Sequence, residues 1–168
     1  MEKVAGMDRR RPQPPFATRP LASLLRTRRQ VDGHGERGKV VLFNDTYASY
    51  MEPQVGVSAV ELLEGCGYEV IIANAGCCQR PRLSKGLVRA AKRDGTKTMQ
   101  KLDVYAKQEL PILCLGPSCA SALADDLPDL VDDAGMGQRV AACVKMIDVF
   151  LEDEVVAGRI APLKIEPG

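Results

Sequence analysis

Short apolar runs alternate with longer segments of helical periodicity along most of the chain after Lys39. The runs at 39–44, 69–73 and 111–115 predict three buried strands, because uninterrupted apolar runs of this length are typical of parallel sheets. Helical periodicity follows at 53–65, 84–109, 118–131 and 138–157. This alternation predicts an α/β fold, a Rossmann-like three-layer unit with a short parallel sheet and a C-terminal helix.

Local signals set the expected ends of these helices. Pro53 stands where a first helical turn tolerates proline, and Gly65 marks the end of the same helix. Ser84 is the expected N-cap of the next helix, which Gly95 is expected to interrupt. A break is expected near Pro128 in the third helix, because proline removes a backbone hydrogen bond.

The loops that follow the three strands carry most of the residues capable of chemistry. In a right-handed parallel arrangement these loops, at 44–52, 74–83 and 116–119, emerge at the same carboxyl edge of the sheet. Residues about forty positions apart are thereby expected to meet. The residues concerned are Asp45, Thr46, Cys77, Cys78, Pro117, Ser118 and Cys119.

Composition and charge divide the chain into two parts. At 168 residues it has the size of about one domain. Residues 1–39 hold ten Lys and Arg against four Asp and Glu, whereas residues 40–168 hold thirteen against eighteen. We therefore expect a basic, Pro- and Arg-rich flexible leader at 1–38 and a single cysteine-rich domain at 39–168.

Several function classes are disfavoured by what the sequence lacks. Aromatic residues make up 4% of the chain and Trp is absent, which argues against a nucleic-acid partner that stacks on aromatic rings. No GxGxxG motif follows the first predicted strand, and neither a GxxxxGK[ST] nor a GxSxG motif occurs. No apolar run reaches bilayer length and no secretory signal is recognisable, so we expect a cytoplasmic protein.

Three of the six cysteines have a packing explanation. Cys66 falls at the far end of the first helix, and Cys143 lies on the apolar pattern of the last. Cys114 stands inside the third predicted strand between two leucines. We interpret all three as small buried hydrophobic residues.

The other three cysteines are candidates for chemistry. Cys77 and Cys78 are adjacent in a loop, where they could bind metal or cycle between dithiol and disulfide. Cys119 opens a predicted helix, whose N-terminal dipole favours a thiolate. A basic run from Arg80 to Lys101 either favours thiolates or forms a solvated helix face.

Four segments carry a resemblance to a known family: FNDTYASYMEPQVGVSAVELLEGCGYEV, CCQRPRLSKGL, PILCLGPSC and AACVKMIDVFLEDEVVAGRIAPL. Together they resemble the cysteine-rich CCG domain of iron-sulfur oxidoreductase subunits of the glycolate oxidase and heterodisulfide reductase type. The nearest version is the C-terminal part of FAD-linked oxidases of the D-lactate dehydrogenase kind. The likeness runs from about Lys39 to Pro167 and covers one repeat of a domain that occurs in tandem pairs.

The resemblance assigns Cys77 and Cys78 to the two cysteines of the CCG triplet and Cys119 to the last cysteine of a CxxC. Three positions depart from the family pattern. Asp45 lies in the Asn-Asp-Thr that stands where a first cysteine is expected, Gln79 replaces the glycine of the triplet, and Gly116 replaces the first cysteine of the CxxC.

By this resemblance the chain is an electron-transfer module with an iron-sulfur cluster, such as 4Fe-4S, held by Cys77, Cys78 and Cys119. Asp45 is a candidate oxygen ligand, although a carboxylate is a poorer partner for cluster iron than a thiolate. The implied partner is a flavin-containing oxidase acting on a 2-hydroxy acid such as lactate or glycolate, with FAD on the partner or parent chain only. Peripheral membrane association would then occur through that partner, and autonomous turnover is not expected.

Two alternatives remain open at this point. One is a noncatalytic structural fragment or partner-binding scaffold, with zinc or nothing at the cysteine site. The other is thiol redox chemistry between Cys77 and Cys78, which would require a strained ring.

Overall fold

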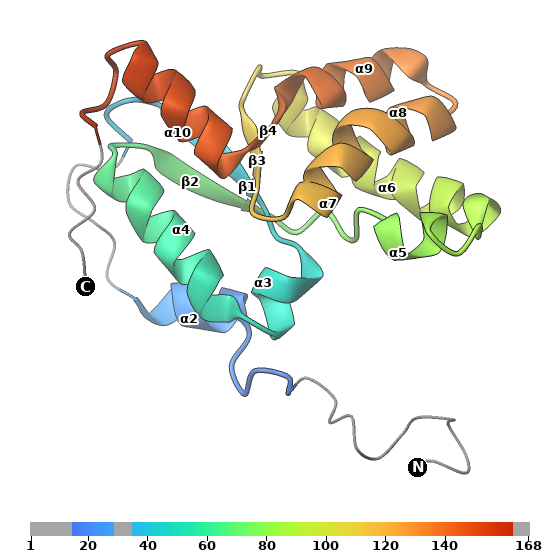
Figure 1. The fold of residues 1–168 in the computed structure, drawn as a ribbon, viewed down its shortest axis with the longest axis horizontal. Coiled ribbons are helices and arrows are strands. Elements are labelled where there is room, and N and C mark those ends of the chain that lie inside the picture. Colours follow the sequence, from blue (N-terminus) through green and yellow to red (C-terminus); the bar gives the residue numbers. More distant parts are fainter. Residues whose placement is uncertain (1–14, 29–34, 163–168) are drawn as a thin grey trace.

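The computed structural model describes residues 15–28 and 35–162, and its core is a four-stranded parallel sheet. The strands are β1 (Lys39–Phe43), β2 (Glu69–Ala73), β3 (Ile112–Cys114) and β4 (Val144–Met146), in the spatial order β2-β1-β3-β4 (Figure 1). β1 pairs with β2 from Lys39↔Glu69 to Phe43↔Ala73, and with β3 at Val41↔Ile112. The predicted α/β, Rossmann-like class is confirmed.

Helices cover both faces of the sheet. α4 (Pro53–Gly65) and α10 (Ile147–Val156) lie on one face, whereas α6 (Val88–Ala106), α8 (Leu127–Leu130) and α9 (Ala134–Cys143) lie on the other (Figure 1). Five shorter helical segments complete the described fold: α2 (Leu21–Thr27), α3 (Thr46–Tyr50), α5 (Arg80–Leu83), α7 (Pro117–Ser121) and the π-helical η1 (Ala122–Asp126).

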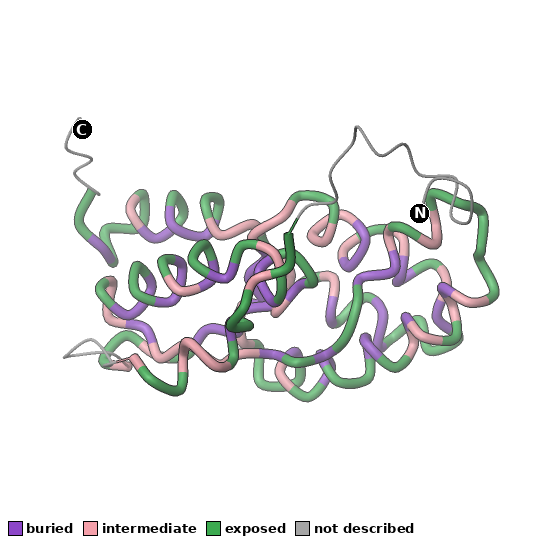
Figure 2. Tube along the Cα trace, turned by 90° about the horizontal axis from the view of Figure 1, so that it is seen from below, coloured by how far each residue is buried: buried purple, intermediate pink, exposed green. Residues whose placement is uncertain are grey.

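The central strand β1 separates two hydrophobic clusters. Its side chains alternate, so that Val40 and Leu42 pack with α4 and α10 while Val41 and Phe43 pack with α6, η1 and α8. These four residues are at most 1% exposed. Buried positions accordingly follow the inner sides of the helices in Figure 2. A strand covered on both faces must be apolar at every position, as the sequence of β1 is after Lys39.

The predicted single helix at 138–157 is wrong, because β4 divides it into α9 and α10. Val144 leaves the helix with φ −77° and ψ 129°, and its strand pairs with β3 at Ile112↔Val144 and Cys114↔Met146. The apolar spacing of 138–157 fits one continuous helix. The pairing with β3, a long-range interaction that periodicity does not record, favours the strand.

The start of the helix predicted at Ser84 also needs correction. Ser84 is the C-cap of α5, its N–H donating to the Arg80 carbonyl, and α6 begins at Val88. The expected interruption at Gly95 is absent, since α6 runs through it. A β-carbon there would come within 2.5 Å of Leu127, so the glycine permits close packing of α6 on α8.

The expected break in the third helix takes the form of a change in hydrogen bonding. The π-helical turn η1 ends at Asp126, and Pro128 occupies the first turn of α8. Proline is tolerated there because the first N–H groups of a helical turn need no intrahelical acceptor.

Part of the predicted leader packs against the body of the fold. Leu21, in α2, is fully buried above Gly56 of α4, where an added β-carbon would meet the Leu21 side chain at 2.5 Å. The Arg28 guanidinium donates to Glu64 Oε2 at 2.7 Å. Residues 35–37 of the leader form a turn that precedes β1. Residues 1–14 and 29–34 lie outside the described part of the chain.

Leu21→Ala is expected to lower the free energy of unfolding by about 3 kcal/mol, because it removes a fully buried side chain and leaves a cavity against α4. Urea denaturation of the full chain measures this loss. Val156→Ala, at an 81% exposed position of α10, serves as the control and should change the value by less than about 0.5 kcal/mol. Equal stability of Leu21→Ala and wild type would show that α2 is not part of the folded unit.

Candidate functional site at the carboxyl edge of the sheet

A cavity of about 470 Å³ opens at the carboxyl edge of the sheet. Its walls come from the three loops that follow β1, β2 and β3, together with α3 and the start of α4. β2 lies on one side of β1, and β3 and β4 lie on the other, so the chain changes direction across the sheet at β1. Open α/β sheets usually bind ligands at the carboxyl edge beside such a switch point. The cavity is lined by Asp45, Thr46, Tyr47, Ala48, Glu52, Val55, Cys77, Cys78, Arg80, Pro81, Leu115, Gly116, Ser118 and Cys119.

Cys78 and Cys119 are in direct contact across this edge. Their Sγ atoms are 3.2 Å apart and share a hydrogen bond, although 41 positions separate them in the sequence. Cys78 is buried and Cys119 is partly exposed. The expectation that the parallel topology would bring these two loops together is therefore confirmed.

The pair holds its two protons with very different affinities. The hydrogen bond with Cys119 lowers the pKa of Cys78 below the usual thiol value, against the opposing effects of burial and of the Asp45 charge. The same hydrogen bond, with burial and the charges of Cys78 and Asp45, raises the pKa of Cys119. The first proton thus leaves the pair easily and the second with difficulty.

The expectation of a thiolate at Cys119 needs correction on this point. It relied on the dipole at the start of α7, which is only five residues long. Within the pair, the contact with Cys78, burial and the nearby carboxylate all raise the pKa of Cys119.

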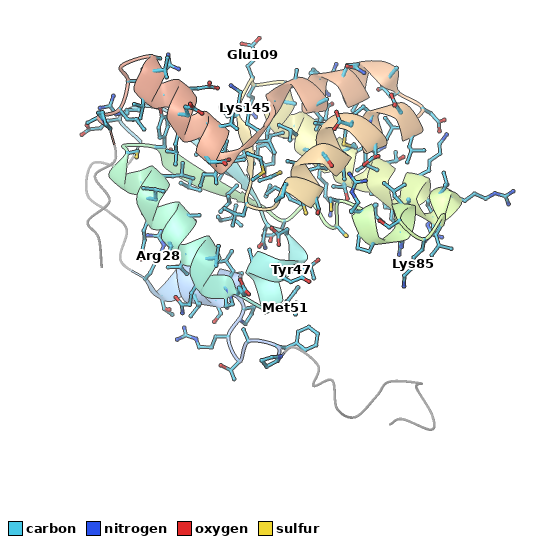
Figure 3. The ribbon with its side chains drawn as sticks, viewed as in Figure 1. Arg28, Tyr47, Met51, Lys85, Glu109 and Lys145 are labelled. Carbon is cyan, nitrogen blue, oxygen red and sulfur yellow. The ribbon has the colours of Figure 1, made fainter. Side chains whose placement is uncertain are left out.

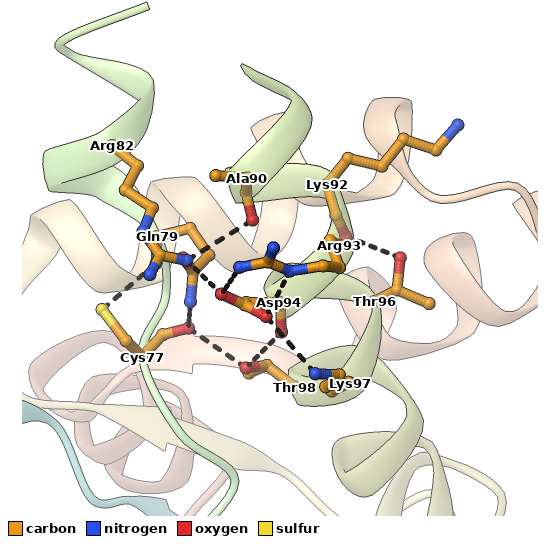
Figure 4. Close-up of polar contacts among 10 residues, drawn as sticks. All are labelled: Cys77, Gln79, Arg82, Ala90, Lys92, Arg93, Asp94, Thr96, Lys97 and Thr98. Atoms are coloured by element: carbon orange, nitrogen blue, oxygen red, sulfur yellow. Dashed lines mark hydrogen bonds and ion pairs between the residues drawn. The ribbon is translucent and has the colours of Figure 1, made fainter. Parts of the chain in front are cut away.

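Cys77 is exposed and its thiol is bound locally. The Gln79 N–H donates to Cys77 Sγ at 3.4 Å, and partial burial raises the pKa of the thiol against this hydrogen bond. The Cys77 carbonyl accepts from Gln79 Nε2 at 2.9 Å and from Thr98 Oγ1 at 3.1 Å (Figure 4). The loop that carries Cys77 is thereby fixed to α6.

Gln79 has a structural role at this site that the sequence pattern did not reveal. It is 4% exposed and has φ 66°, in the left-handed region that favours glycine. Its side chain compensates by donating to Cys77 and accepting from Arg82 Nη1 at 2.9 Å.

Asp45 lies beside the thiol pair as a helix cap. Its Oδ1 accepts from the Ala48 N–H at 2.9 Å, and its charge raises the pKa of both Cys78 and Cys119. The loop after β1 is tied to the loop after β2 by Asn44, whose Nδ2 donates to Asn74 Oδ1 at 2.7 Å. No sequence signal predicted that link, because an isolated Asn in a loop has many uses.

Several members of the basic run form ion pairs with carboxylates of α6 and of the segments next to it. Arg82 and Arg93 both pair with Asp94, and these contacts keep the pKa of that carboxyl well below its usual value. Arg80 pairs with Asp126 at 2.7 Å, and Lys85 points away from the fold in Figure 3. The Arg82 charge lowers the pKa of Cys77, as the smallest of the causes given there, and the Arg80 N–H lowers that of Cys78 through a hydrogen bond.

The three cysteines interpreted as packing residues are buried to different degrees. Cys114 is fully buried in β3, and burial raises the pKa of its thiol to about 12. Cys66 and Cys143 are half-buried rather than fully buried. Cys66 packs in the cluster of α4 and α10, and Cys143 Sγ donates to the Ala106 carbonyl at 3.9 Å.

The described residues meet the predicted ligand set only in part. Cys78 and Cys119 are adjacent, and Cys77 and Asp45 line the same cavity but make local hydrogen bonds. Within 15–28 and 35–162, no three His, Cys, Asp or Glu side chains are grouped so that they could hold one metal ion. The arrangement is thus a two-thiol centre beside a cavity and not a complete four-ligand site.

The fold and the site together define a Rossmann-like α/β domain with a thiol pair beside a cavity at the carboxyl edge of its sheet. The chain is 22% identical over 135 residues to a subunit of the anaerobic glycerol-3-phosphate dehydrogenase of Escherichia coli strain K12, and equally to the corresponding protein of strain O157:H7. The match covers 78% of this chain and 33% of each relative, so the chain spans about a third of their length. No family model and no solved structure matches the chain.

This similarity relates the chain distantly to one component of an oxidoreductase. In the part of the chain that the structure describes, no helix combines the length and apolar character needed to cross a bilayer.

The contact between the two thiols predicts how the metal-free protein titrates. Cys119→Ala should raise the pKa of Cys78 from about 6 toward the ordinary thiol value, because the largest lowering contribution, the hydrogen bond with Cys119, is lost while burial and the Asp45 charge remain. At neutral pH the thiolate fraction at Cys78 should consequently fall. Ultraviolet absorbance of the thiolate against pH measures the change.

Cys143→Ala is the matched control, since that thiol is partly buried in α9 and bonds only to the Ala106 carbonyl. The lowest thiol pKa should be the same in this variant as in wild type. An unchanged lowest pKa in Cys119→Ala would contradict the assignment of the shift to the thiol pair.

Proposed function

We propose that this chain is an electron-transfer module of a multi-subunit oxidoreductase and binds an iron-sulfur cluster. The observation that carries the proposal is the contact between Cys78 and Cys119, contributed by loops after two different strands of one sheet. The distant similarity to a dehydrogenase component supports the oxidoreductase context. The resemblance to the CCG domain supports iron-sulfur as the cofactor.

The ligands we assign are Cys77, Cys78 and Cys119, with Asp45 as a candidate oxygen ligand. Thiolate is the preferred ligand of cluster iron, and the low first pKa of the thiol pair makes one thiolate available at neutral pH. A bound cluster would supply one-electron redox chemistry. The chain itself would shield Cys78 from water and hold Cys119 beside it through the fixed loops of the sheet edge.

The electrons would come from a flavin on a partner or parent chain. The family resemblance favours oxidation of a 2-hydroxy acid such as lactate or glycolate, whereas the similar E. coli proteins are named for glycerol-3-phosphate. Both substrates are alcohols whose oxidation releases two electrons. We therefore propose an alcohol-oxidising flavoprotein as the partner, with a 2-hydroxy acid as the first substrate to test.

Serine substitution of the assigned ligands provides the test of cofactor binding. Cys78→Ser and Cys119→Ser should abolish stoichiometric iron and sulfide binding after anaerobic reconstitution, because a hydroxyl is a poor ligand for cluster iron. Cys77→Ser should reduce it strongly. Metal analysis and the visible absorption spectrum of the full-length protein measure the loss.

Cys66→Ser and Cys143→Ser are the controls, as both thiols are half-buried and lie in other parts of the fold. They should retain the cluster. Equal loss of iron in all five variants would contradict the assignment by loop position. A colourless wild-type protein with about one zinc, or with no metal at all, would instead support a structural or partner-binding fragment.

A further inference from the structure

The thiol pair is nearly close enough to form a covalent bond. The Sγ atoms of Cys78 and Cys119 are 3.2 Å apart, and a disulfide bond is about 2.0 Å long, so the sulfurs need to approach by only about 1.2 Å. The exposed Cys77 is the other possible partner of Cys78. Its sulfur accepts the Gln79 N–H, and a bond between adjacent cysteines would close a strained ring, so Cys119 is the favoured partner.

The cavity gives small molecules access to this pair. Both sulfur-bearing residues line its wall, and Cys119 is partly exposed whereas Cys78 is buried beneath it. A volume of about 470 Å³ is within the range of small-molecule sites. A reagent entering the cavity therefore reaches a wall that carries both residues of the pair.

We propose that Cys78 and Cys119 form a reversible disulfide in the metal-free chain by exchange with a low-molecular-weight disulfide. One sulfur of the pair attacks one sulfur of the small disulfide RSSR, forms a mixed disulfide and releases one thiol. The other sulfur then attacks that mixed disulfide at the protein sulfur, forms the Cys78–Cys119 bond and releases the second thiol. The protein dithiol is oxidised, RSSR is reduced to two RSH, and both protein protons leave with the released thiols.

Proximity is what makes this exchange favourable. Because the two sulfurs are held in contact, attack of the second protein sulfur on the mixed disulfide is intramolecular. It therefore competes effectively with attack by free RSH on the same mixed disulfide. The bond joins the loop after β2 to the start of α7 and closes a long loop of the chain, which restricts the unfolded state. Oxidation also removes two of the thiols that metal binding would require.

Peptide mapping tests this directly on the full-length, metal-stripped protein. The protein is equilibrated with oxidised and reduced glutathione in varied ratio, quenched by acid and alkylation, and digested with trypsin. Cys66, Cys77 and Cys78 then fall in peptide 40–82, and Cys119 falls with Cys114 in peptide 108–139. Oxidation should link these two peptides, and dithiothreitol should separate them.

Variants and fragment spectra identify the two sulfurs. The linked peptide should be lost in Cys78→Ser and in Cys119→Ser, and should persist in Cys66→Ser and Cys77→Ser. Fragment ions of the wild-type linked peptide assign the same bond without any variant, so a poorly folded variant leaves the test intact. Oxidation should also raise the melting temperature of wild type but not of Cys119→Ser.

Three results would overturn the proposal. They are free Cys78 and Cys119 in fully oxidised glutathione, a linked peptide that persists in Cys119→Ser, and a bond within peptide 40–82 between Cys77 and Cys78 as the main product. The outcome is independent of the proposed cofactor, because a chain that binds no cluster can still form the bond. Likewise, a chain that binds a cluster can fail to form the disulfide when the metal is removed, so the two proposals can fail separately.

Discussion

The pairing of β1 with strands on both sides is the constraint on which the rest of this structure depends. β1 is hydrogen-bonded to β2 on one side and to β3 on the other, and its side chains divide between the two hydrophobic clusters. All three strands run parallel, so their following loops share one edge. The contact between Cys78 and Cys119 is a consequence of that pairing and not of any local sequence signal.

The same edge brings Asp45 next to the thiols, and its charge opposes ionisation of both. The hydrogen bond between the sulfurs is therefore the interaction that keeps a thiolate accessible at this otherwise unfavourable, largely buried position.

The sequence was informative where one physical requirement dominated. β1, β2 and β3 are continuous apolar runs because strands covered on both faces need apolar side chains throughout, and their positions were predictable to within about two residues. The meeting of Cys78 and Cys119 followed from topology alone. Their role as ligands, in contrast, stays a prediction.

The sequence was less informative where a distant contact chose between two local structures. β4 is a strand because β3 offers it a partner, and periodicity contains no trace of that partner. Gly95 resembles a helix breaker until Leu127 of another helix is seen against it. Leu21 lies in a segment of basic composition, yet the absence of a side chain at Gly56 lets it pack against α4.

Gln79 connects the local backbone to the incomplete ligand set. With φ 66° it adopts a conformation that costs a non-glycine residue about 1 kcal/mol or more, and its side chain offsets this through hydrogen bonds to Cys77 and Arg82. Those bonds fix the Cys77 carbonyl, while the Gln79 N–H holds the Cys77 sulfur. A glycine would adopt the same turn without the side-chain bonds and leave the Cys77 segment freer to turn toward the pair. The N–H and the side chain of Gln79 thus bind the Cys77 sulfur and carbonyl locally, while the sulfurs of Cys78 and Cys119 lie 3.2 Å apart at the same edge.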